Sequence, residues 1–290
     1  MSTKSSSTSS FSNSGKTLLK FKSEERLTEY ETPHPEWKLG DGAVNETPEF
    51  SAPWDEHKKI SFDPYGAGRN PINNYLLTVT ALAPKPPQIG LMATVSKSGN
   101  HNLAPYSYFG VVGYDPLMLV VGTTKSTGKY KNTARNLLET GEATVNIISE
   151  WFVEAANASS TNAPEEVSEW PLAGLTQVPS ELVKAPHVLE SAVSFETRVH
   201  TAIPIQSRAD PTRESGDVFL LEVVRVHARA DLVDNKEDPG AIDLVGLRPV
   251  TRVGTMQYGR LTEILTLPKI TYASPQFEAL KGERFQKKLS

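Results

Sequence analysis

Short apolar runs separated by turn residues fill the middle of the chain. Each run is rich in β-branched or aromatic residues and ends at Gly, Asn, Asp or Pro, which is the pattern of a β-strand. The expected strands are residues 89–96, 105–112, 117–122, 143–149, 192–204 and 217–234. In the last of these, apolar side chains fall on both faces, as in a barrel wall. Residues 97–100 and Asp115-Pro116 are expected to separate the first three strands.

Helical patterns are fewer than strand patterns. Residues 133–142 form the clearest helix, with Leu137 and Leu138 as an apolar patch and Gly141 as a C-terminal stop. Shorter helices are expected near 151–156 and 164–169, and residues 72–82 fit a short helix only ambiguously. Strands dominate and do not alternate with helices. The sequence therefore predicts a mainly β fold, a β-barrel with helical insertions, and not a doubly wound sheet.

The composition changes along the chain and suggests four segments. Residues 1–15 are a disordered Ser-rich tail, and residues 16–69 are an extended arm whose spaced aromatics could hold it on a barrel or on a partner subunit. Residues 70–270 form the folded domain, and residues 271–290 are a C-terminal tail.

Charge and cysteine content exclude several classes of function. The chain has no cysteine, which rules out disulfides, thiolate metal sites and Cys nucleophiles. The net charge is −4 and the basic residues are scattered, so nucleic acid is not an expected partner. No apolar run approaches the roughly 20 residues of a membrane helix. The Ser-rich start with its lysines faintly resembles a transit peptide, but a disordered tail is preferred and we expect a cytoplasmic protein.

The common sequence motifs of nucleotide-binding and metal sites are incomplete or absent. Gly15-Lys16-Thr17 imitates the end of a P-loop but lacks the upstream glycine, and no Gly-x-Gly-x-x-Gly is present. The histidines show no metal-ligand spacing, so no metal is expected.

A first candidate site is an anion site between residues 122 and 133. The strand at 117–121 ends in Gly122-Thr123-Thr124-Lys125, and Lys131-Asn132-Thr133 opens the helix. A helix start leaves backbone N–H groups free, and the hydroxyls of Thr123, Thr124 and Thr133 with the Lys131 ammonium would complete an anion site. Alternatively, Asn132 or Thr133 caps the helix after an ordinary turn. Taken by itself, this segment favours that alternative.

A second candidate site is the segment Asn102–Phe109. It places Asn102, Pro105 and Ser107 among aromatic residues, and Pro105 cannot donate to a β-ladder, which implies an edge or a bulge. Backbone amides freed there could bind a ring edge, and the aromatics could pack on a flat ring. A kinked edge strand with two surface tyrosines is the alternative, and the residues alone leave the two even.

Together these segments resemble the flavin-reductase-like, FMN-binding split β-barrel family over roughly residues 70–265. The further matching segments, in the family's order, are Gly90–Ser96, Asn102–Phe109, Lys131–Thr133 with Asn136, Thr140–Glu142, Val145-Asn146, Asn157–Ser159, Ser168-Glu169, Ala173–Thr176, Pro179-Ser180, Glu190-Ser191, His227, Arg248-Pro249, Arg252, Gly254 and Tyr258. Departures from the pattern are Asn132 for the usual acid, Lys85 for an arginine, and Val253 for a glycine.

The resemblance implies a homodimer with FMN near the subunit interface. Residues that would meet the ring system and ribityl chain are Thr94, Ser96, Asn102, Leu103, Ala104 and Ser107, with Pro105 in the same set. Residues that would hold the phosphate are Thr123, Lys131 and Thr133, with Thr124 and Asn132 beside them. His227 matches a histidine near the nicotinamide in family members, although a core or surface histidine is an equal alternative.

The implied activity is that of an oxidoreductase in which NADH or NADPH passes hydride to FMN and electrons pass onward. No catalytic residue is named. The alternatives are a non-catalytic flavin-binding electron carrier or redox-sensing module, and a structural barrel without cofactor.

Overall fold

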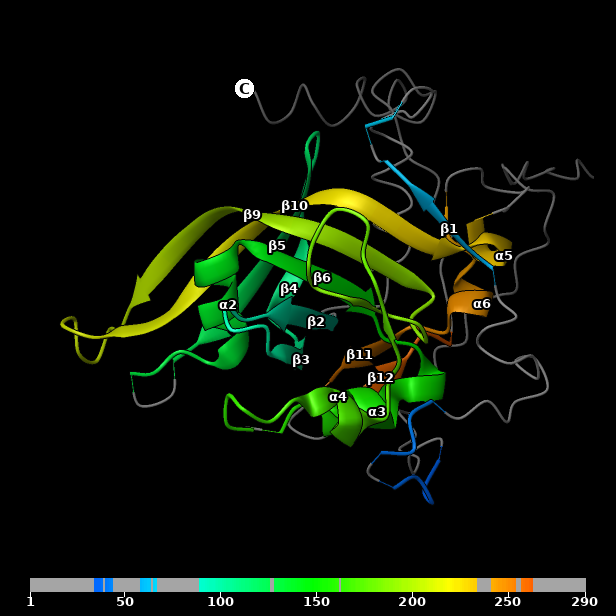
Figure 1. Ribbon diagram of the computed structural model, residues 1–290, viewed down its shortest axis with the longest axis horizontal. Coiled ribbons are helices and arrows are strands. Elements are labelled where there is room, and N and C mark those ends of the chain that lie inside the picture. Colours follow the sequence, from blue (N-terminus) through cyan, green and yellow to red (C-terminus); the bar gives the residue numbers. More distant parts are fainter. Residues whose placement is uncertain are drawn as a thin grey trace, which may run out of the picture. The chain divides into compact units, whose positions relative to one another are not determined.

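One antiparallel sheet carries most of the strands in the computed structural model (Figure 1). The structure describes residues 34–38, 40–43, 58–63, 65–66, 89–125, 128–161, 163–233, 241–253 and 257–262. All of these except Thr262 belong to one unit, Glu29–Leu261, which is described here by itself. The ambiguous helix at 72–82 and both tails lie outside the described residues.

The strands of this sheet follow the order β3-β2-β6-β9-β10-β5-β4. Their bounds are β2 (Gly90–Val95), β3 (His101–Tyr106), β4 (Phe109–Tyr114), β5 (Leu117–Thr124), β6 (Glu142–Ile147), β9 (Val193–Gln206) and β10 (Glu214–Arg229). β1 (Lys59–Phe62) also pairs with β10. Two short pairs lie outside the sheet, β7 (Gln177–Val178) with β8 (His187–Val188) and β11 (Val250–Arg252) with β12 (Tyr258–Arg260). The mainly β fold with helical insertions is thus confirmed.

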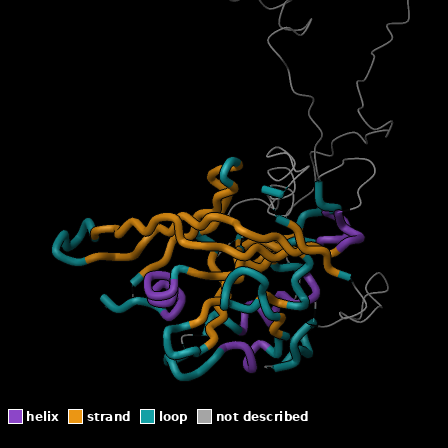
Figure 2. The backbone as a smooth tube through the Cα atoms, turned by 45° about the horizontal axis from the view of Figure 1, so that its top comes forward, coloured by secondary structure: helices purple, strands orange, loops and turns teal. Residues whose placement is uncertain are grey.

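The helices are short and lie in the connections between strands. They are α2 (Asn132–Thr140), the 3-10 turn Glu150–Phe152, α3 (Val153–Ala158), α4 (Glu169–Ala173), α5 (Ala230–Val233) and α6 (Leu244–Leu247). α2 contacts β2, β3 and β6, while α3 and α4 contact each other and β3. In Figure 2 the helices α2, α3 and α4 with their loops lie on one side of the long β9–β10 ribbon. No helix among the described residues is long and apolar enough to cross a membrane.

The expected strand at 105–112 is wrong as a single strand. It is divided into β3 and β4 by a bend at Ser107-Tyr108. β3 pairs with β2 at one end of the strand order, whereas β4 pairs with β5 at the other. The bend is held where Gly122 N donates to Tyr108 O across 2.7 Å. The chain therefore passes from one edge of the sheet to the other at this point, which brings the two edges together as a barrel requires.

Pro105 lies in β3, the end strand of the order, as its missing N–H predicts. The turn at 97–100 and the break at Asp115-Pro116 also occur where expected.

β10 shows how one strand can serve two surroundings. Phe219, Leu221 and Val223 point inward and are fully buried, and the inward positions change to Val226 and Ala228 after a register shift. Such a bulge adds one residue to one strand and reverses which positions face the core. The expectation of apolar residues on both faces is confirmed, since Val218 and Leu220 on the other face are half-buried.

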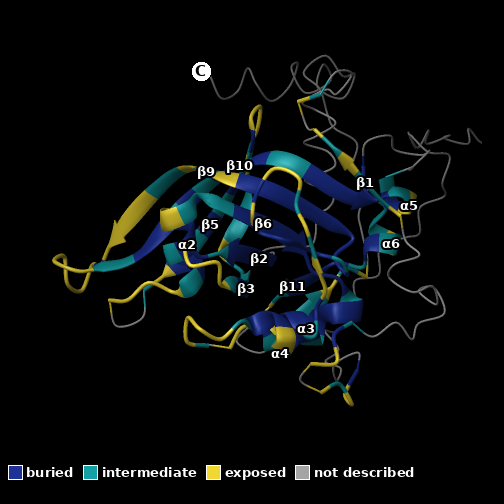
Figure 3. Ribbon diagram, viewed as in Figure 1, coloured by how far each residue is buried: buried dark blue, intermediate teal, exposed yellow. Residues whose placement is uncertain are grey.

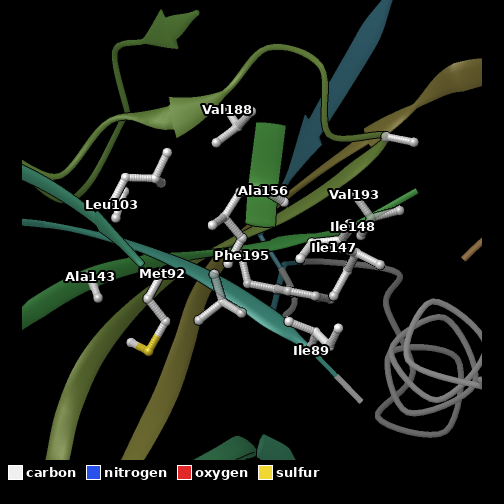
Figure 4. Close-up of a cluster of buried hydrophobic side chains, with 14 of the residues drawn as sticks. Ile89, Met92, Leu103, Ala143, Ile147, Ile148, Ala156, Val188, Val193 and Phe195 are labelled. Carbon is white, nitrogen blue, oxygen red and sulfur yellow. The ribbon is translucent and has the colours of Figure 1, made fainter. Parts of the chain in front are cut away.

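Aliphatic and aromatic side chains from the sheet and the α3 region form one core. Figure 4 shows Met92, Leu103, Val193 and Phe195 from three strands packed with Ala156 from α3. Figure 3 shows the buried strands at the centre and the exposed outer part of the β9–β10 hairpin. The core therefore fixes β3 and the helices that follow β6 relative to each other.

The described parts of the N-terminal arm contact the domain. His34 N and Nδ1 lie 3.2 and 3.3 Å from the carboxylate of Glu154 on α3. Trp37 and Phe62 pack against the core. These two aromatic residues thus contact the same chain's domain.

Candidate functional site

A cavity of about 750 Å³ opens between β3, the end of β5, the start of α2 and the region from the end of α3 to the start of α4. This volume is within the usual range of small-molecule and cofactor sites. The residues that line it are Asn102, Ala104, Pro105, Tyr106, Ser107, Tyr108, Gly122, Thr124, Lys125, Lys129, Tyr130, Lys131, Asn132, Ser159, Ser160, Thr161, Ala163 and Glu169.

The start of α2 forms one end of the cavity and carries no side-chain cap. The N-cap residue is Lys131, whose side chain makes no capping hydrogen bond, and the first turn holds no acidic residue. Asn132 Oδ1 instead accepts from Arg135, and Thr133 Oγ1 accepts from Asn102. The alternative that Asn132 or Thr133 caps the helix is therefore wrong. The uncapped N–H groups and the positive end of the helix dipole leave a site suited to an anion.

Buried polar side chains join β3 to α2 behind the cavity wall. Asn102 Nδ2 donates to Thr133 Oγ1 at 2.9 Å and lies 3.5 Å from Thr94 Oγ1. Asn136 Nδ2 donates to the same Thr94 hydroxyl at 3.0 Å. All four residues are buried. Because buried polar groups that lose a partner are costly, this network holds the wall in one geometry.

Two tyrosines give the cavity an aromatic wall and mouth. Tyr106 is half-buried, and desolvation raises the pKa of its phenol to about 12 although a hydrogen bond with Thr133 acts in the opposite direction. Tyr108 is 69% exposed and lies beside Gly122, where an added Cβ would come within 3.0 Å of the Tyr108 Cβ. A glycine at 122 thus allows the two backbones to approach.

Three lysines line the cavity, but one of them is already paired. Lys125 forms an ion pair with Glu214 and lies 3.8 Å from the centroid of the Tyr130 ring. Desolvation would lower the pKa of Lys125, but the Glu214 and Tyr130 contacts outweigh it and raise the pKa to about 12. Lys129 and Lys131 are exposed, and no ion pair joins either to another described residue. These two ammonium groups are available to an anionic ligand.

Glu169 is the first residue of α4 and is 3% exposed. Its Oε2 accepts a hydrogen bond from Leu103 N of β3 at 3.1 Å. Desolvation raises the pKa of the carboxyl group above its ordinary value, and the backbone hydrogen bonds from Leu103 and Glu169 itself lower it only in part. A buried carboxylate is thereby placed against the β3 wall.

Most of the cofactor residues expected from the sequence meet at this cavity. Those that line it are Asn102, Ala104, Pro105, Ser107, Thr124, Lys131 and Asn132. Thr94 and Thr133 lie directly behind Asn102, and Ser96 borders a small neighbouring cavity of about 10 Å³. Leu103 turns its side chain into the core, and the Thr123 hydroxyl lies 3.4 Å from Asp217 O inside the barrel.

His227 is not brought to the cavity. Its Nε2 lies 2.7 Å from Glu196 Oε1, and its ring stacks on His187 with centroids 4.3 Å apart. His227 is 4% exposed, between β1 and β9.

Several cavity residues were not assigned a role from the sequence. They are Glu169, Tyr130, Lys125, Lys129 and the Ser159–Thr161 segment. Asn157–Ser159 and Ser168-Glu169 were among the segments of the resemblance, so their position in the sequence was a usable signal. Their meeting with β3 depends on how α3 and α4 pack.

The barrel with its cavity is shared with known proteins. Residues 86–243 match the family model for a flavin reductase like domain. An uncharacterised protein of Halalkalibacterium halodurans is 37% identical over 199 residues, covering 68% of this chain and 91% of its own length.

Solved structures extend the likeness to the fold. Nitrilotriacetate monooxygenase component B from Bacillus cereus is 32% identical, with a TM-score of 0.59 over 72% of this chain and 98% of its own. An FMN-binding domain of a flavin reductase-like enzyme from Shewanella baltica has a TM-score of 0.52 over 73% of this chain and 98% of its own, at 11% identity, and shows likeness of fold alone. The chain belongs to the flavin reductase-like family of split β-barrels.

Proposed function

We propose that this protein binds FMN in the cavity between β3 and α2 and acts as an NADH- or NADPH-dependent oxidoreductase. The observation that carries the proposal is the uncapped start of α2, with Lys131 at its N-cap, at one end of a cavity large enough for a cofactor. A phosphate would satisfy the free N–H groups there, and FMN carries both a phosphate and a flat polar ring system.

The described residues fit such a cofactor. Lys131 and the first-turn N–H groups of α2 would hold the phosphate, with Thr124 and Lys129 beside them. The β3 segment from Asn102 to Ser107, fixed by the Thr133 contact, would bind the ring system. Thr123 is left out of the phosphate site because its hydroxyl lies within the barrel.

Bound FMN would supply the redox chemistry, accepting hydride from a nicotinamide donor and passing electrons onward, while the protein supplies binding and orientation. The chain's own contribution is the β3 wall, which the hydrogen bond from Asn102 to Thr133 holds in place, and the aromatic side chain of Tyr108 at the mouth of the cavity. A cytoplasmic location, where reduced nicotinamide nucleotides are produced, belongs to the same proposal.

A second copy of the chain is proposed as the partner. Large apolar side chains are exposed on β4 and on the outer part of β9, namely Val112, Tyr114, Ile203 and Ile205. A second chain that covered these side chains would remove their apolar surface from water, which favours association. Light scattering on the purified protein should give the mass of a dimer, and a monomer at all working concentrations would contradict this part of the proposal.

A non-catalytic flavin carrier or sensor is the competing function, and one experiment separates the two. The FMN-loaded protein is mixed anaerobically with NADH and, separately, with NADPH, while the absorbance of oxidised flavin is followed. Bleaching within seconds to minutes with either donor supports the oxidoreductase. Flavin that stays oxidised with both donors, but is bleached by a chemical reductant, would leave only the carrier or sensor.

A further inference from the structure

Glu169 stands apart from the other side chains of the cavity. Of the described residues that line the cavity, it alone is acidic, while Lys125, Lys129 and Lys131 are basic. A carboxylate is an unexpected neighbour for a cofactor that carries a phosphate, so its position calls for a reason.

The surroundings of Glu169 leave its charge largely uncompensated. Its partner on β3 is the neutral Leu103 N–H, and no lysine or arginine among the described residues forms an ion pair with it. With only 3% of the residue exposed, desolvation raises the pKa of the carboxyl group. A group in this position gains a proton readily when further negative charge arrives nearby.

The other ionisable groups around Glu169 are neutral, are paired with another residue, or lie elsewhere in the cavity. On β3, Tyr106 is a neutral phenol whose pKa burial raises to about 12. On α3, which packs against α4, Glu154 is bound by His34. Lys125 is paired with Glu214, and Lys129 and Lys131 lie by the start of α2. Glu169 is therefore the cavity group best placed to change protonation when charge is added in the cavity.

We infer that Glu169 is a redox-linked proton acceptor, taking up one proton when FMN bound in this cavity is reduced and releasing it on reoxidation. The inference rests on the proposed function, because it requires FMN in the cavity. A reduced nicotinamide nucleotide delivers two electrons and one proton and is itself oxidised, which adds one negative charge to the flavin. Glu169 then forms an O–H bond with a proton from solvent, and the charge of the site returns to its earlier value.

The test is the reduction potential of the FMN-loaded protein as a function of pH, for the wild type and Glu169→Gln. The glutamine keeps an oxygen that can accept from Leu103 N but cannot titrate. Glu166→Gln is the matched control, since Glu166 is exposed and does not line the cavity. Glu169→Asp retains a carboxyl group and guards against a glutamine variant that does not fold.

For the wild type and Glu166→Gln we expect a range of pH in which two protons accompany two electrons, a slope of about 60 mV per pH unit. In that range Glu169→Gln should follow about 30 mV per pH unit, so that its potential becomes progressively more positive than that of the wild type. Glu169→Asp should keep a range with the slope of about 60 mV per pH unit, but at a different pH. In the reduced-minus-oxidised infrared spectrum, a protonated-carboxyl band should appear in the wild type and be absent from Glu169→Gln.

Equal slopes in wild type and Glu169→Gln, or a wild-type infrared spectrum without the carboxyl band, would overturn this role while leaving FMN binding and reduction intact. Failure of the folded wild type to bind FMN would instead overturn the proposed function, and the role of Glu169 with it.

Discussion

The side-chain amide of Asn102 donates to the hydroxyl of Thr133 across 2.9 Å, and both residues are almost fully buried. This bond joins β3 to the first turn of α2, which are the two walls of the cavity. A site held by such a contact needs little rearrangement when a ligand arrives.

Asn102→Ala should weaken the fold and the site together. It removes a buried donor to the Thr133 hydroxyl, which keeps only its contact with Tyr106, and should cost about 1–3 kcal/mol in the free energy of unfolding. Urea denaturation measures the loss, and binding of FMN and riboflavin should weaken alike because the shared wall is disturbed. Asn100→Ala, in the exposed turn before β3, is the control and should stay within about 0.5 kcal/mol of the wild type. Equal stability of the two variants would contradict the role of the bond.

Lys131→Ala should distinguish FMN from riboflavin. Loss of one charge-assisted contact should cost about 1.5–3 kcal/mol in binding free energy, and only FMN carries the phosphate that makes it. Isothermal titration of both flavins measures the difference, with Lys97→Ala, in an exposed turn away from the cavity, as the control. Thr133→Ala should weaken the binding of both flavins, because the Thr133 hydroxyl accepts the hydrogen bond from Asn102 that holds the wall of the cavity. Equal losses of FMN and riboflavin in Lys131→Ala would refute the phosphate assignment.

Gly174→Ala should be much more damaging than Gly141→Ala. Both glycines follow a helix and have a positive φ, 67° at Gly174 and 71° at Gly141. Alanine should therefore cost a similar backbone strain of about 1 kcal/mol at each position. At Gly141 an added Cβ meets nothing within 4 Å, whereas at Gly174 it would lie 2.1 Å from Gly40 O of the arm. Urea denaturation should therefore show a larger loss for Gly174→Ala, with faster proteolysis of the arm. Similar losses in both variants would show that the arm does not pack on α4 as described.

Acid should destabilise the protein through His187. Desolvation, then the neighbouring His227 and Lys59, lower the pKa of His187 from 6.5 to about 3, with Glu196 opposing them in part. Between these two values the unfolded chain binds a proton that the folded chain does not. The contribution is complete above pH 6.5 and is lost as the pH falls, by about 1.4 kcal/mol per pH unit for one proton.

Denaturation of wild type and His187→Phe at several pH values measures this slope. Phenylalanine keeps a ring against His227 but cannot bind a proton, so the variant should lose less stability between pH 6.5 and pH 4. His200→Gln, at an exposed position, should behave as the wild type. An unchanged slope in His187→Phe would show that His187 does not stay neutral in the folded state.

Local sequence patterns predicted the elements whose structure depends on near neighbours. The turn after β2 and the stop of α2 at Gly141, whose N–H bonds Leu137 O, were accessible because glycine and turn residues act locally. The bend at Ser107-Tyr108 was not, because it depends on Gly122, which comes later in the chain and pairs across the barrel.

The site was predicted to the same extent and for the same reason. The resemblance located β3 and the start of α2. The sequence named both Thr123 and Thr124, of which Thr124 lines the cavity, since strand alternation decides which threonine faces inward. The uncapped state of α2 required knowing that Thr133 bonds Asn102 instead of its own helix. The burial of Glu169 arises from packing of α4 on β3, for which no local pattern exists.

The central claim is that FMN binds in this cavity with its phosphate at the start of α2, and flavin titration tests it most directly. Flavin-free protein is titrated into FMN and into riboflavin while flavin fluorescence is followed. We predict saturable binding of FMN near one per chain, with riboflavin weaker by at least about tenfold, as expected for the loss of a charged contact. Folded protein that leaves the fluorescence of both flavins unchanged, or that binds them equally, would contradict the account.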